Sequence, residues 1–107
     1  MRVPSDRAVP HARTADLSAE VLEQAANGDR GAAARVLEAS YDQVRGMLLR
    51  LVGPGPDVDD CVQTALLRIV TRLGQLREPG AFSTWVGGIC VNVARDHFRR
   101  RRVRDVV

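Results

Sequence analysis

Residues 57–73, DVDDCVQTALLRIVTRL, form the most regular stretch of this 107-residue chain. Their apolar side chains recur every three or four positions, as along one side of an α-helix. Asp57 suits the N-cap, and the acids after it suit the positive end of the helix dipole. Because such a helix must bury its stripe against other elements, the stretch predicts a helix within a bundle. The predicted inward residues are Val58, Cys61, Val62, Ala65, Leu66, Ile69, Val70 and Leu73. The predicted outward residues are Asp59, Asp60, Gln63, Thr64, Leu67, Arg68 and Arg72.

Two more helices are predicted before this stretch. Residues 53–56, GPGP, break the chain in front of it. A long helix that precedes the break has Asp29 as its predicted N-cap. A shorter helix is predicted over residues 17–27, and Gly28 ends it. The residues of the long helix that we expect to face the core are Val36, Leu37, Tyr41, Val44, Met47, Leu48 and Leu51.

A loop over residues 74–80 leads to the last predicted helix, over residues 82–101. We find no alternating strand pattern and no internal repeat, so we expect an all-α fold, a compact bundle of about four helices. The expected inner stripe of the last helix is Phe82, Trp85, Val86, Ile89, Val93 and Phe98. Gly88, Asn92, Arg95, Arg99 and Arg102 recur on another side.

The length suits one domain. Residues 1–15 contain two prolines and no apolar period, so we expect a disordered N-terminal tail there, a helical domain over 16–103 and a C-terminal tail over 104–107. No secretory signal and no run of about 18 apolar residues is visible, which favours a cytoplasmic protein without membrane contact. Cys61 and Cys90 fall on apolar helix sides, and we expect both to be buried and reduced.

Positive charge is concentrated near the C-terminus. Residues 95–107 contain six Arg and two Asp, whereas residues 1–94 contain ten Arg and eleven acids. A polyanion is therefore the natural partner of the last helix.

Three stretches in series resemble region 2 of the extracytoplasmic-function sigma factors of bacterial RNA polymerase. Residues 25–32, AANGDRGA, resemble A-x-x-G-D-x-x-A. Residues 57–68, DVDDCVQTALLR, resemble D-x-x-D-x-x-Q-E-x-F-x-R. Residues 82–85, FSTW, then Ile89, then residues 92–96, NVARD, and an Arg run resemble F-x-x-W-L-Y-R-I-A-x-N-x-A-x-D-x-x-R-R. The match covers residues 17–102. It implies a transcription initiation factor that binds core polymerase and recognises and melts the minus-ten promoter element.

The sequence also departs from the family pattern. Thr64 stands at a position that is usually acidic, and Leu66 stands where Phe is common. Gly87 and Gly88 replace a Tyr-Arg pair, although two glycines inside a helix cost roughly 1 kcal/mol each against Ala. The chain stops after the Arg run, before the family's second DNA-binding domain, and we expect it to be one domain of a longer protein.

The resemblance implies two binding surfaces, with no cofactor, metal or catalytic group. One binds the clamp helices of the polymerase β′ subunit, and an anti-sigma factor is a further implied partner. The residues carried over to this surface are Asp57, Asp60, Gln63, Leu67 and Arg68.

The second implied surface binds the single-stranded non-template strand of the promoter. Its loop holds a base flipped from the stack, and Asn92 occupies the position of the base-reading amide. Trp85 lies near the upstream edge of the melted segment. The residues expected at the DNA are Leu76, Arg77, Glu78, Pro79, Gly80, Ala81, Thr84, Trp85, Gly88 and Asn92, with Arg95, Arg99, Arg100, Arg101 and Arg102 at phosphates.

Three other functions fit the sequence less well. Catalysis lacks a nucleophile–base pair or a metal-spaced cluster, since His11 lies in the tail and His97 among arginines. A helix-turn-helix regulator of duplex DNA would read bases early in its second helix, whereas the basic residues here come late in the last helix. A decoy that binds polymerase without reading promoters would share the motifs, and DNA-binding measurements would identify it.

Overall fold

The computed structural model describes residues 13–106, and these form an all-α fold, as predicted. The main helices are α2 (Ala19–Ala26), α3 (Arg30–Val52), α4 (Pro56–Arg72) and α5 (Phe82–Val106). Short 3-10 turns occupy Thr14–Asp16, Leu73–Gln75 and Pro79–Ala81.

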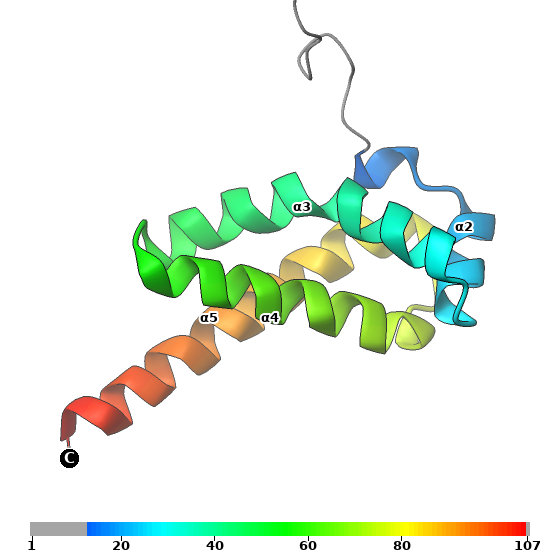
Figure 1. The fold of residues 1–107 in the computed structure, drawn as a ribbon. Helices are drawn as coiled ribbons and strands as arrows, with labels where there is room; N and C mark the ends of the chain where they lie inside the picture. The colour runs from blue at the N-terminus through cyan, green and yellow to red at the C-terminus, as the bar shows by residue number, and fades with distance from the viewer. Residues whose placement is uncertain (1–12, 107) are drawn as a thin grey trace, which may run out of the picture.

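Helices α3, α4 and α5 make the body of the bundle. α3 and α4 pack along each other in opposite directions, and α5 crosses behind both (Figure 1). α2 packs on the first half of α3, near the end of α4. The last turns of α5 project beyond the other helices, so the arginine-rich end of the chain stands out from the bundle (Figure 1).

Local chemistry explains where the helices begin. Asp29 Oδ1 accepts a hydrogen bond from the Ala32 N–H at 2.8 Å, which confirms Asp29 as N-cap. The prediction that Asp57 caps α4 is wrong, because both the N-cap and the start of the helix lie two residues earlier than predicted. Pro56 is its first residue, where the missing N–H of proline costs nothing, and Asp57 lies in the first turn. Gly55, with φ of 136°, is the N-cap, in a conformation that other residues rarely adopt.

The core lies where α3, α4 and α5 meet. The predicted inward residues of α4 are buried, except that Leu66 and Val70 are half-buried. In α3 the prediction was partly wrong, since Tyr41 and Leu51 are 43% and 39% exposed. Ala39 and Ser40 are buried instead, and the Ser40 hydroxyl is satisfied because it donates to the Val36 carbonyl oxygen at 2.7 Å.

α5 is longer than predicted, and in its second half the buried residues differ from the predicted ones. It runs to Val106, so residues 104–106 are helical rather than a tail, and residue 107 lies outside the described residues. Phe98 is 38% exposed, whereas Cys90, Ala94 and His97 are buried. These three continue the stripe that starts at Phe82 with helical spacing.

The N-terminal segment was predicted as a tail over residues 1–15. Residues 1–12 lie outside the described residues, and with them His11. Thr14 and Ala15 belong to the first 3-10 turn, where the Thr14 hydroxyl donates to Gln43 Oε1 at 3.3 Å. α2 begins at Ala19 rather than residue 17, because Ser18 Oγ accepts from the Val21 N–H and so caps the helix.

Candidate nucleic-acid and protein interfaces

The polar residues of α5 divide between two roughly opposite sides of the helix. Successive residues are rotated by about 100° around the helix axis, so their sequence spacing alone separates the two groups of side chains. One side carries Gly88, Asn92, Arg95, Arg99 and Arg102, all of them exposed. The other side carries His97, Arg100, Arg101 and Arg104, which line a pocket against the start of α4. Arg100 and Arg101 therefore do not share a side with Arg95, Arg99 and Arg102, the other arginines expected at the DNA.

The predicted DNA-reading loop, residues 76–81, is exposed except at one anchor point. Leu76 is half-buried and packs against the core, whereas residues 77–81 are exposed. The loop lines a cavity of about 240 Å³ whose other wall is α2. Asn92 is not among the residues that line this cavity, so the structure does not join the loop and the amide in one pocket there.

The first turns of α5 hold the remaining residues expected at the DNA. Trp85 is half-buried, with its ring centroid 5.9 Å from that of Phe82, while Thr84 is exposed. Gly87 faces α3, and a Cβ there would lie 3.6 Å from Met47 Cε. A Cβ on Gly88 would meet no atom within 4 Å. A Cβ would therefore make an ordinary contact at Gly87 and meet open space at Gly88, so packing requires glycine at neither position.

The residues expected at the polymerase do not all have the same surroundings. Asp57, Asp60 and Gln63 are exposed, and Leu67 is 62% exposed on the outer side of α4. Arg68 differs because its Nη2 lies 3.1 Å from Asp96 Oδ2 of α5, with both side chains about three-quarters buried. Its guanidinium is thus engaged inside the domain.

Asp96 is the centre of a small charge cluster that the sequence analysis did not assign to a site. It also pairs with Arg99, one turn along α5. The hydrogen bond from Arg68, with the nearby charges of Arg99 and Arg100, holds the pKa of Asp96 below its ordinary value. Its spacing of three residues from the buried Val93 was the sequence signal that it faces the bundle.

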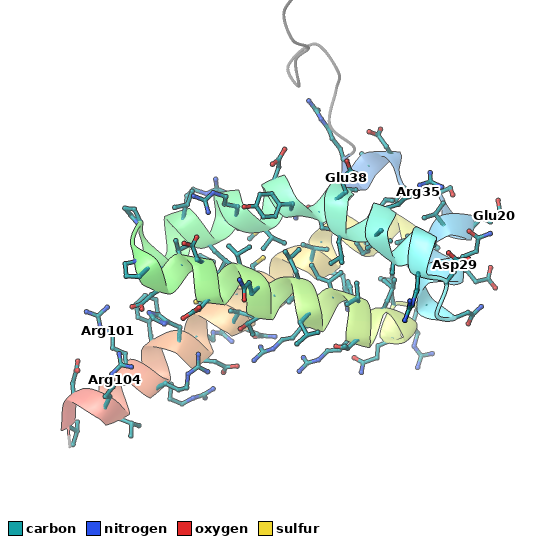
Figure 2. The ribbon with its side chains drawn as sticks, viewed as in Figure 1. Glu20, Asp29, Arg35, Glu38, Arg101 and Arg104 are labelled. Atoms are coloured by element: carbon teal, nitrogen blue, oxygen red, sulfur yellow. The ribbon has the colours of Figure 1, made fainter. Side chains whose placement is uncertain are left out.

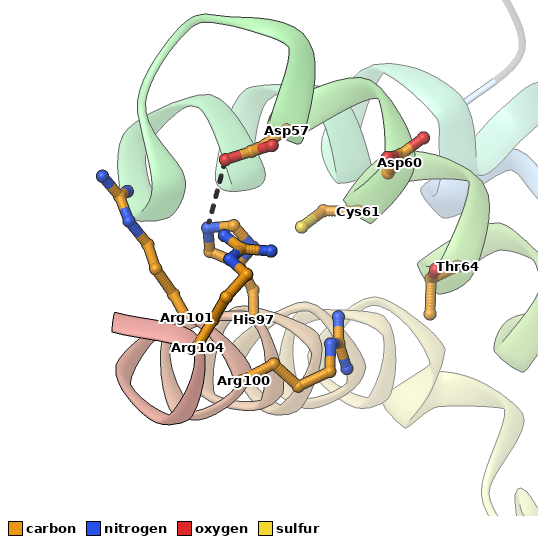
Figure 3. Close-up of a pocket in the computed structure, with 8 residues that line it drawn as sticks. All are labelled: Asp57, Asp60, Cys61, Thr64, His97, Arg100, Arg101 and Arg104. Carbon is orange, nitrogen blue, oxygen red and sulfur yellow. Dashed lines mark ion pairs between the residues drawn. The ribbon is translucent and has the colours of Figure 1, made fainter. Parts of the chain in front are cut away.

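The pocket between the start of α4 and the projecting half of α5 has a volume of about 190 Å³ (Figure 3). His97 Nε2 lies 3.8 Å from Asp57 Oδ2, which is longer than a hydrogen bond. This nitrogen is buried and has no hydrogen-bond partner. Arg100, Arg101 and Arg104 extend from α5 along the same pocket, with Asp60 and Thr64 on the α4 wall. The burial of His97 was not predicted, because its position among arginines indicates an exposed side chain.

The cysteines, as predicted, are buried and unpaired. Burial raises the pKa of Cys90 to about 11. Burial also raises the pKa of Cys61, and Asp57 and Asp60 add to the increase while Arg100 opposes it. Within residues 13–106, no three His, Cys, Asp or Glu side chains group as a metal site would require, and no helix is long and apolar enough to cross a bilayer.

Comparison with known proteins gives the family. Residues 36–104 match the family model for sigma-70 region 2. The chain belongs to the sigma-70 region 2 family. The match spans most of α3, all of α4 and nearly all of α5. It confirms the family that the sequence resembles and contains the second and third stretches, whereas residues 25–32 lie before it.

Two curated relatives of this region 2 chain are themselves named as sigma factors. The probable RNA polymerase sigma factor RfaY of Xanthomonas campestris is 35% identical over 97 residues, which is 90% of this chain and 24% of the relative. The RNA polymerase sigma-H factor of Pseudomonas aeruginosa is 28% identical over 94 residues, 86% of this chain and 49% of the relative. The chain thus spans half or less of either relative. No solved structure matches it significantly.

Proposed function

We propose that this domain is the part of a sigma factor that binds core RNA polymerase and takes up the non-template strand of the minus-ten element. The observation that carries the proposal is the side of α5 on which Asn92 shares a row with Arg95, Arg99 and Arg102, all exposed. An amide can donate to and accept from one base edge, and the arginines below it can hold the phosphates that follow. Family membership and the names of the relatives support the same role.

The arginines of this side supply affinity rather than sequence preference. Each phosphate contact adds roughly 0.7 to the slope of log affinity against log salt for a single strand. Arg95 and Arg102 are free for this task, since neither forms an ion pair within residues 13–106. Arg99 must first exchange Asp96 for a phosphate, or hold both at once.

Base reading falls to the start of α5 and the loop before it. The exposed loop residues 77–81 and the exposed Thr84 lead directly into the side that carries Gly88 and Asn92. Trp85 is half-buried against Phe82, so part of its indole remains exposed and could stack on an unpaired base while the rest packs on the core. Stacking of this kind stabilises a melted strand by roughly 1–3 kcal/mol per base. Capture of the unpaired strand is how the domain would favour melting.

Docking on the polymerase falls to the outer side of α4. Asp60, Gln63 and Leu67 are exposed there and combine a charge, an amide and an apolar side chain. Such a combination suits an arginine-bearing helical partner, the chemistry expected of the β′ clamp helices. Arg68 contributes by fixing α4 against α5 rather than by direct contact, since Asp96 already holds it.

The test is to bind the domain to core polymerase and then select from a library of minus-ten non-template oligonucleotides. We expect the wild-type complex to select a preferred base pattern. Asn92→Ala should bind polymerase equally, fold normally and lose preference at one position. Unchanged preference would show that Asn92 does not read a base. A domain that binds polymerase but selects no sequence would be the decoy considered above, and would overturn the promoter-reading role.

A further inference from the structure

The arginine run of α5 is the feature that the proposed promoter contact does not fully use. Arg100, Arg101 and Arg104 lie at spacings of one, three and four residues and turn toward α4, away from the side that carries Asn92. Within the described residues none of the three forms an ion pair, and all are exposed. Three unpaired guanidinium groups on one side of a helix form a surface that can bind carboxylates or phosphates.

The other wall of this pocket is acidic, which decides the class of partner. Asp57 and Asp60 line it with their carboxylates, and Asp60 forms no ion pair in the described part of the chain. A nucleic-acid backbone carries one sign of charge only. A phosphate brought to Arg100 or Arg104 would therefore also approach two carboxylates, which weakens its binding. A protein surface can offer carboxylates to the arginines and cationic side chains to the aspartates at the same time.

The pocket is continuous with the outer side of α4. Asp60 and Thr64 line it, and Gln63 and Leu67 follow on the same helix at adjacent positions. A partner that contacts Asp60 from outside would thus lie beside the projecting end of α5, where Arg101 and Arg104 extend (Figure 2). The first turn of α4 and the last turns of α5 form two sides of one mixed-charge cleft (Figure 3).

We infer that α5 serves two partners on opposite sides, and that Arg100, Arg101 and Arg104, together with Asp57 and Asp60, dock core RNA polymerase rather than promoter DNA. This inference rests on the proposed function, since it extends the polymerase surface of α4 onto α5. It assigns Arg100 and Arg101 to the protein partner and leaves Arg95, Arg99 and Arg102 for phosphates. A helical segment with alternating acidic and basic side chains is the chemistry that the cleft accepts.

Two charge-matched double variants separate the two sides. Arg101→Glu with Arg104→Glu changes the pocket side, and Arg95→Glu with Arg102→Glu changes the side of Asn92. Both pairs are exposed and on the same helix, and both alter the net charge equally. Arg30→Glu with Arg35→Glu, on exposed positions in the first turns of α3, is a third pair at the other end of the molecule, where Figure 2 shows Arg35. Circular dichroism and thermal melting establish that all three remain folded.

Affinity for core polymerase is measured first without DNA. We expect the Arg101/Arg104 pair to weaken it about tenfold or more, with steeper loss at low salt, and the Arg30/Arg35 pair to leave it within about twofold. The Arg95/Arg102 pair should act instead on capture of a minus-ten oligonucleotide by the preformed complex. Equal polymerase affinity for the Arg101/Arg104 and Arg30/Arg35 pairs would overturn the inference, as would a loss of oligonucleotide capture in the Arg101/Arg104 complex matching that of the Arg95/Arg102 complex.

Asp60→Ala distinguishes failure of this inference from failure of the proposed function. If Asp60→Ala weakens polymerase binding and the Arg101/Arg104 pair does not, docking uses α4 alone and only the inference falls. If the wild-type domain itself does not bind core polymerase, the proposed function fails and the inference fails with it.

Discussion

Arg68 Nη2 lies 3.1 Å from Asp96 Oδ2, so one partly buried charge pair joins the second half of α4 to the middle of α5. The two helices carry the two proposed binding surfaces on their outer sides. The pair, together with the apolar core between the helices, therefore fixes the orientation of one surface relative to the other. Arg68 and Asp96 lie in two different stretches that resemble the family motifs, and the structure shows that the two side chains contact each other.

Asp96→Asn should lower stability at neutral pH and lose this effect in acid. The hydrogen bond from Arg68 holds the pKa of Asp96 below its ordinary value in the folded state. The carboxylate therefore stabilises the fold fully above about pH 4, the ordinary range of Asp, and loses this contribution as pH falls through the lowered pKa. Urea unfolding of both proteins at pH 7 and at decreasing pH measures the difference. Asp42→Asn, at an exposed position of α3, is the control, and an Asp96→Asn deficit that grows in acid would contradict the account.

The apolar spacing was enough to predict the helices, because burial of one stripe per helix is what holds this fold together. The predicted core of α3 was wrong where a small polar residue is buried and a large aromatic one is exposed. Ser40 is fully buried because its hydroxyl bonds within its own helix, whereas Tyr41 one position on is exposed. The burial of His97 was not predicted for a similar reason, since a histidine among arginines suggests a solvent-exposed position.

The candidate site was predictable as a set of residues but not as an arrangement. Family motifs placed Asn92 and Asp60, and both are exposed as a binding role requires. The motifs could not show that Arg68 is paired with Asp96, nor that Arg100 lines a pocket with residues at the start of α4. These facts depend on where α5 crosses α4, which no local pattern encodes.

Leu67→Ala and Leu48→Ala remove the same atoms but should impair different properties, polymerase binding in the first and stability in the second. Leu48 is fully buried, so its truncation should lower the free energy of unfolding by about 2–5 kcal/mol. Leu67 is 62% exposed, so its truncation should change stability by less than about 0.5 kcal/mol but weaken polymerase binding. Chemical unfolding and a polymerase-binding titration measure the two effects. A strong loss of stability in Leu67→Ala would show that this leucine is packed and not a docking residue.

The two thiols should be protected from alkylating and disulfide reagents in the folded protein. Burial raises the pKa of Cys90 to about 11, so at pH 8 only about one thiol in a thousand is ionised there. Cys61 is shifted in the same direction. We expect labelling by a chromogenic disulfide reagent to be slow for both cysteines and complete on addition of denaturant. Rapid labelling of one cysteine in native buffer would show that its helix opens readily, and Cys61→Ala with Cys90→Ala as separate variants would identify which.

Gly88→Ala should stabilise the domain and at the same time weaken its capture of promoter DNA. Gly88 lies inside α5, where alanine is favoured over glycine by about 1 kcal/mol, and a Cβ there meets nothing within 4 Å. The loss of stability that glycine causes at position 88 is explained if a nucleotide approaches the helix at this point, beside Asn92. Gly87→Ala is the matched control: its Cβ would contact Met47 at an ordinary distance of 3.6 Å, on the side that faces α3. We expect both variants to melt at higher temperature, and only Gly88→Ala to bind the minus-ten oligonucleotide less tightly in the polymerase complex. Equal DNA affinity of the two variants would remove Gly88 from the promoter surface.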